Sequence, residues 1–66
     1  MPVINIDGPH LTKEQKAQLV EAIVEQSSKI MNIPREAFVT IIRENEQDNI
    51  GNGTQLLSEK MKKNNE

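Results

Sequence analysis

The sequence predicts an α/β protein, a single βαβ unit with parallel strands and a C-terminal hairpin. Two short runs of apolar and β-branched residues, at positions 3–6 and 38–44, are typical of strands. The segment between them has the spacing of an amphipathic helix, and glycines at positions 51 and 53 suit a tight hairpin. A connection this long joins parallel strands through a right-handed crossover. At 66 residues, the chain forms one domain with a small core.

The first strand, at residues 3–6, follows directly after Pro2. Removal of the initiator Met1 would leave Pro2 at the N-terminus. Inside a chain the proline nitrogen is an amide without basicity, whereas a free N-terminal proline is a rigid, basic secondary amine. Pro2 is therefore a candidate proton carrier. The alternative is an ordinary Met-Pro start with no chemical role.

The central segment is expected to form one amphipathic helix of about five turns. Thr12 and Gln15 have the spacing of a capping box, in which hydroxyl and amide satisfy free backbone donors. Pro34 ends the helix, because the residue before a proline is pushed out of the α region. Residues 34–37 could form a short turn. The apolar side of the helix is expected to consist of Leu19, Val20, Ile23, Val24, Ile30 and Met31.

The second strand is expected at residues 38–44, and the rest of the chain is rich in turn residues. Leu56 and Leu57 could form a short strand or a helical turn. Residues 58–66 are rich in lysine and asparagine, which favours a frayed, solvated tail. The predicted organisation is therefore a βαβ domain at residues 1–57 and a polar C-terminal tail at residues 58–66.

Both strands carry apolar residues on both faces. One face of the predicted sheet would present Val3, Val39 and Ile41, and the other Ile4, Ile6, Phe38 and Ile42. One helix can cover only one face of a two-stranded sheet, and so small a sheet is unstable alone. We therefore expect a homo-oligomer in which partner chains cover the second face.

The composition excludes several classes of function. Without cysteine the chain has no disulfide framework and no thiol nucleophile, and a single histidine, His10, excludes a multi-histidine metal site. A net charge of −2 and one aromatic residue disfavour nucleic-acid binding. No apolar run reaches the roughly 20 residues of a membrane span, and no signal peptide is recognisable, so we expect a cytoplasmic protein. Gly51 and Gly53 lack the strand-to-helix context of a phosphate loop.

Four segments together resemble the 4-oxalocrotonate tautomerase family (2-hydroxymuconate tautomerase). They are Met1-Pro2-Val3-Ile4-Asn5-Ile6, Leu11-Thr12-Lys13-Glu14-Gln15-Lys16, Thr40-Ile41-Ile42-Arg43-Glu44 and Ile50-Gly51-Asn52-Gly53. The resemblance extends to about residue 57. It implies a βαβ subunit assembled as a hexamer, with the N-terminal proline as general base. It also implies proton transfer in an enolisable 2-oxo acid, such as 2-hydroxymuconate, without cofactor or metal.

The chain departs from the family at the substrate-binding positions. Family members that act on dicarboxylate dienols carry one arginine just before the helix cap and another early in the second strand. The matching positions here are Leu11 and Val39, and the family's aromatic residue before Gly-x-Gly is Ile50. Two substitute cations are candidates for the substrate site, His10 beside Leu11 and Arg43 on the strand face of Val39.

Both substitutes have ordinary alternatives. His10 could be an incidental surface histidine. Arg43 lies about 13 Å along the strand from Val39, so it could reach a shared pocket only across a subunit interface. The ordinary alternative for Arg43 is an ion pair, for example with Glu44 or Glu46 of a neighbouring chain.

The sequence therefore predicts a cofactor-independent tautomerase with Pro2 as base, modest in rate or adapted to a smaller or different 2-oxo acid. Two alternatives stay open. One is another proline-based reaction, such as hydration of an unsaturated acid, for which Glu44 or Asp7 would activate water. The other is an oligomeric interaction module that keeps the fold without the chemistry. Removal of Met1 is required for the tautomerase and for any other proline-based reaction.

Overall fold

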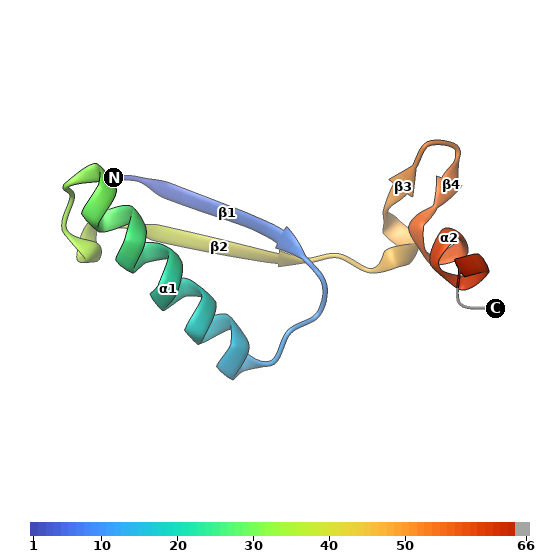
Figure 1. The fold of residues 1–66 in the computed structure, drawn as a ribbon, viewed down its shortest axis with the longest axis horizontal. Helices are drawn as coiled ribbons and strands as arrows, with labels where there is room; N and C mark the ends of the chain where they lie inside the picture. The colour runs from blue at the N-terminus through green and yellow to red at the C-terminus, as the bar shows by residue number, and fades with distance from the viewer. Residues whose placement is uncertain (65–66) are drawn as a thin grey trace.

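The computed structural model describes residues 1–64, a βαβ unit followed by a small hairpin and a helix (Figure 1). The elements, in order, are β1 (Val3–Gly8), α1 (Lys13–Met31), the 3₁₀ turn η1 (Arg35–Ala37), β2 (Val39–Glu44), a second 3₁₀ turn η2 (Gln47–Asn49), β3 (Gly51–Asn52), β4 (Gln55–Leu56) and α2 (Leu57–Asn64). Strands β1 and β2 pair in parallel, and β3 pairs with β4 in antiparallel orientation. The predicted βαβ fold with a C-terminal hairpin is confirmed.

Helix α1 begins and ends with the caps that its sequence encodes. The Thr12 hydroxyl accepts a hydrogen bond from the Gln15 backbone N–H at 3.1 Å, and the Gln15 side chain accepts one from the Thr12 N–H at 2.9 Å. The predicted capping box is therefore present. Asn32 ends the helix in the left-handed conformation with φ 56°, which asparagine tolerates better than most residues. These caps fix α1 as the crossover between the two strands.

The two faces of the β1–β2 sheet differ in exposure. Val3 pairs with Val39 in the register and Asn5 with Ile41, and the side chains alternate between half-buried and exposed along both strands. Helix α1 covers the half-buried face (Figure 1). On the uncovered face Val3, Val39 and Ile41 keep 48%, 40% and 42% of their area exposed.

The described part of the isolated chain has no fully buried core. None of residues 1–61 is fully buried. The accessible surface is 5341 Å², whereas a compact monomer of 7.5 kDa exposes roughly 4,200 Å². The Cα radius of gyration is 15.8 Å, against about 11 Å for a compact domain of this length. An extended subunit with exposed apolar surface supports the expectation that partner chains complete the fold.

Residues 45–64 form a C-terminal arm that extends away from the βαβ unit (Figure 1). Gly53 takes a positive φ of 65° in the β3–β4 turn, a conformation that glycine adopts without strain. Leu56 ends β4 and Leu57 begins α2, so the two leucines contribute to a strand and a helix respectively. The Leu57 N–H donates to the Ile50 carbonyl at 2.7 Å and ties the helix back to the start of the hairpin.

The expectation of a frayed tail from residue 58 is wrong as far as residue 64, because α2 runs to Asn64. Leu57 and Met61 lie one turn apart and give the helix an apolar side that the polar composition conceals. Residues 65 and 66 of the predicted tail lie outside the described residues. The division into a 1–57 domain and a 58–66 tail stays a prediction.

Candidate active site

Pro2 lies at the end of the sheet where β1 and β2 begin. Its carbonyl accepts a hydrogen bond from the Val39 N–H at 3.0 Å, so Pro2 and Val39 are neighbours. Pro2 is half-buried, whereas Met1 before it is 88% exposed. In the chain with Met1 attached, the Pro2 nitrogen is an amide.

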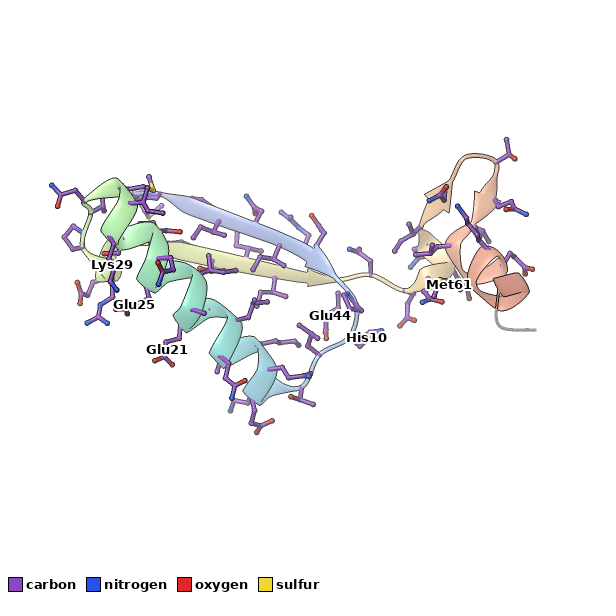
Figure 2. The ribbon with its side chains drawn as sticks, viewed as in Figure 1. His10, Glu21, Glu25, Lys29, Glu44 and Met61 are labelled. Carbon is purple, nitrogen blue, oxygen red and sulfur yellow. The ribbon has the colours of Figure 1, made fainter. Side chains whose placement is uncertain are left out.

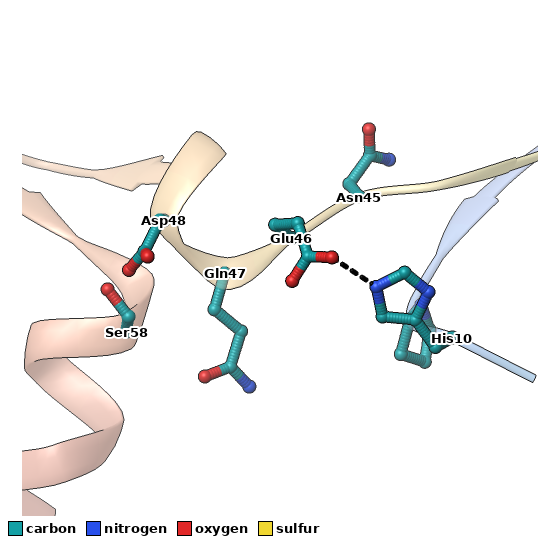
Figure 3. A pocket seen from close by; sticks show the side chains of 7 residues that line it. His10, Asn45, Glu46, Gln47, Asp48 and Ser58 are labelled. Atoms are coloured by element: carbon teal, nitrogen blue, oxygen red, sulfur yellow. Dashed lines mark hydrogen bonds and ion pairs between the residues drawn. The ribbon is translucent and has the colours of Figure 1, made fainter.

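His10 lies at the opposite end, in the loop that follows β1 (Figure 2). Its Nε2 donates to Glu46 Oε1 at 2.5 Å (Figure 3). Its Nδ1 lies 3.6 Å from Glu44 Oε2. The hydrogen bond and charge of Glu46, with a smaller contribution from Glu44, raise the pKa of the His10 imidazole above its ordinary 6.5. His10 therefore joins the loop after β1 to the start of the C-terminal arm.

Glu44 makes several of the polar contacts at this end of the sheet. Its Oε2 accepts a hydrogen bond from the Leu11 N–H at 2.9 Å and pairs with Lys16 Nζ at 3.1 Å. These two contacts, the Leu11 N–H first, hold the pKa of Glu44 below its ordinary 4.5. Sequence reasoning considered Glu44 only as a water activator or as a partner of Arg43. The usable signal was its position, an acid at the end of β2 facing the loop before the helix cap.

Arg43 lies on the uncovered face of the sheet beside Asp7, its partner in the strand register. Its Nη1 is 3.8 Å from Asp7 Oδ2, and both side chains are largely exposed. The structure thus provides a partner within the chain, in addition to the neighbouring Glu44 or Glu46 that the sequence suggested. Ile50 lies in the arm, between η2 and β3, and is half-buried.

A cavity of about 340 Å³ opens between the loop after β1 and the arm (Figure 3). Its described lining consists of Pro9, His10, Asn45, Glu46, Gln47, Asp48 and Ser58. Of the predicted site residues, only His10 belongs to it.

The predicted site residues thus fall into separate groups. Pro2 and Val39 lie together at one end of the sheet, and His10 and Leu11 lie near the other. The extended chain runs from Pro2 to Gly8, six residue steps or about 20 Å at 3.3 Å per residue, and His10 lies beyond that end. A single chain therefore does not bring the candidate base together with the cavity that His10 lines, referred to below as the His10 cavity.

Within the described part of the chain, no cluster of three or more histidine, cysteine, aspartate or glutamate side chains is arranged to hold a metal ion. No helix among these residues has the length and apolarity needed to cross a membrane.

Comparisons with known proteins place the chain in a family. The family model described as "Tautomerase enzyme" matches residues 2–60. Among solved structures, DmpI from Helicobacter pylori is 32% identical with a TM-score of 0.79, over 88% of this chain and 98% of its own. DmpI from Archaeoglobus fulgidus is 30% identical with a TM-score of 0.79, over 86% of this chain and 98% of its own.

A structure of apo unfused 4-OT is also similar. It is 30% identical with a TM-score of 0.81, over 89% of this chain and 98% of its own. A search of curated proteins gave no match. The family model covers most of the chain, and the similar structures share its βαβ fold and hairpin over almost their whole length. The chain therefore belongs to the tautomerase family.

Proposed function

We propose that the protein is a cofactor-independent tautomerase that moves a proton in an enolisable 2-oxo acid, with the Pro2 nitrogen as general base. The single observation that carries the proposal is the place of Pro2, directly before β1 and at the first residue that the family model matches. Removal of the exposed Met1 would convert this nitrogen from an amide to a basic amine. Such an enzyme would act in the cytoplasm on a small enolised 2-oxo acid.

The active form would be a homo-oligomer, and the family resemblance favours a hexamer. Burial of the uncovered face, with Val3, Val39 and Ile41, would supply the apolar contact area. Pro2 and the His10 cavity lie at opposite ends of one chain, so the complete site would combine Pro2 of one subunit with the His10 end of another. An isolated subunit would then lack a functional site.

In this arrangement the neutral Pro2 amine would remove a proton from the substrate's enol oxygen or carbon and return it to another carbon. Apolar walls supplied by Leu11, Val39 and Ile50 would disfavour the charged ammonium form and keep the base available near neutral pH. His10 or Arg43 would stabilise the negative charge that develops on the carbonyl oxygen. No metal is needed for these steps.

The test compares processed wild type with Pro2→Ala on a panel of enolised 2-oxo acids. Mass spectrometry first confirms that both chains begin at residue 2. We expect Pro2→Ala to lose most of the rate, about 10- to 100-fold, because the variant keeps only a primary amine. Pro34→Ala, a proline replacement in the turn before η1, serves as the control and should retain wild-type rates.

The runner-up function is an oligomeric interaction module without catalysis. The specific observation in its favour is that the two family arginine positions hold Leu11 and Val39. Equal rates for Pro2→Ala and wild type, with both variants processed and assembled, would replace the tautomerase proposal by this one. Hydration of an unsaturated acid is the third candidate, and its proposed water activators, Asp7 and Glu44, already pair with Arg43 and Lys16.

A further inference from the structure

The charges around the His10 cavity are mostly negative. Among its described lining residues, Glu46 and Asp48 carry carboxylates and His10 is the one basic group. The remaining lining residues, Pro9, Asn45, Gln47 and Ser58, are uncharged. Even with a protonated imidazole, these seven residues carry a net charge of −1. A cavity of this kind attracts at most one anionic group, and only at His10.

Three basic side chains at this end of the sheet, His10, Lys16 and Arg43, have carboxylate partners. His10 lies between Glu46 and Glu44, and Lys16 Nζ is 3.1 Å from Glu44. Arg43 Nη1 is 3.8 Å from Asp7 Oδ2. A substrate carboxylate would have to compete with these partners for each cation. Among the described residues that line the cavity, His10 is the only one that can carry a positive charge.

A dicarboxylate dienol needs two separate cationic positions, one for each end of the molecule. If its 2-oxo acid end reaches His10, its distal carboxylate lies several Å away, where Glu46 and Asp48 present like charge. A substrate with an uncharged distal end avoids this repulsion and competes with Glu46 for His10 alone. The difference in binding follows from charge alone, because the cavity of about 340 Å³ has room for either molecule.

We propose that this site selects 2-oxo acids with a single carboxylate and an uncharged remainder, and rejects dicarboxylates. The inference rests on the proposed function and specifies its substrate class. In it His10 holds the one carboxylate or the adjacent carbonyl oxygen, and Glu46 and Asp48 act as specificity determinants against a second negative charge.

A matched pair of substrates tests the proposal. 2-Hydroxymuconate carries two carboxylates, and 2-hydroxy-2,4-pentadienoate is the same dienol without the distal one. With processed wild type we expect kcat/KM to be at least about tenfold higher for the monocarboxylate. Raising the salt from about 0.01 M to about 0.5 M should narrow this ratio, because the charges are exposed and screened.

Two variants identify the source of the discrimination. Asp48→Asn should shift the ratio of kcat/KM several-fold toward the dicarboxylate. Glu21→Gln removes the same charge from an exposed position in the middle of α1 and should leave the ratio unchanged. Equal shifts in both variants would overturn the assignment to this cavity.

Different results would overturn the preference for monocarboxylates and the tautomerase activity itself. Turnover that depends on Pro2, with the dicarboxylate equal or preferred, would overturn the inference and leave the tautomerase standing. If neither dienol is turned over, the tautomerase proposal fails and calorimetry decides the inference with 2-oxopentanoate and 2-oxohexanedioate. Tighter binding of the monocarboxylate supports the proposed selectivity. Equal binding of the two acids, tighter binding of the dicarboxylate, or no binding of either acid overturns it.

Discussion

The two ends of the β1–β2 sheet have opposite chemical characters. At one end Pro2 lies beside Val39, a position without charge. At the other end His10 and Lys16 lie among carboxylates, with Glu44 at the centre of the contacts. One end has the candidate base Pro2, and the other has His10, the candidate cation for the substrate. Each chain therefore carries two separate halves of the proposed site, and a complete site depends on the assembly of subunits as well as on the residues.

The largest effect is expected from breaking the contact that would bring the two ends together. Ile41 is 42% exposed on the uncovered face, and an aspartate there would place a charge in the proposed interface. We expect Ile41→Asp to abolish both the oligomer and the activity, measured by sedimentation and by the tautomerisation assay. Ile41→Val keeps the apolar surface and should retain both. An Ile41→Asp variant that sediments like wild type would contradict the account.

A smaller effect is expected at the His10 end. If His10 stabilises charge on the substrate carbonyl, His10→Ala should lower kcat/KM about 10²-fold. His10→Gln keeps a hydrogen-bond donor and should recover part of the loss. A change of less than twofold in His10→Ala would leave Arg43 as the remaining candidate cation.

The His10 contacts also predict a pH dependence. Glu46 raises the pKa of His10, so the folded state binds the proton more tightly than the unfolded state. The resulting stabilisation is fully present below about pH 6.5 and is lost as the pH rises through the raised pKa. Wild type should therefore lose this contribution over that range in thermal unfolding, and His10→Gln should not.

The smallest effect is expected at Glu44, whose contacts are exposed. Its pKa is lowered by the Leu11 N–H and Lys16, so its contribution to stability is present above the ordinary pKa of 4.5 and is lost as the pH falls through the lowered value. Glu44→Gln should lower the Tm by on the order of a few degrees at neutral pH. The difference from wild type should disappear in acid. A constant difference at all pH values would point to packing instead of charge.

Local sequence signals predicted the fold, whereas the contacts between distant segments could not be predicted from the sequence. The Thr12 capping box and the β-branched strands act over a few residues, so the βαβ order was predictable. The Asp7–Arg43 pair depends on the strand register, and the His10–Glu46 contact joins residues 36 positions apart. Helix α2 was missed because most of its residues are polar.

The most direct test of Pro2 as the general base changes only the Pro2 nitrogen. A chain of 66 residues is within reach of chemical synthesis, so one preparation can begin at Met1 and the other at Pro2. Every other atom of the two proteins is the same, and sedimentation checks that both assemble equally. We expect tautomerisation by the chain that begins at Pro2 and a rate about 10²- to 10⁴-fold lower for the chain that keeps Met1. Equal rates for the two preparations would contradict it, because an amide nitrogen cannot serve as the base.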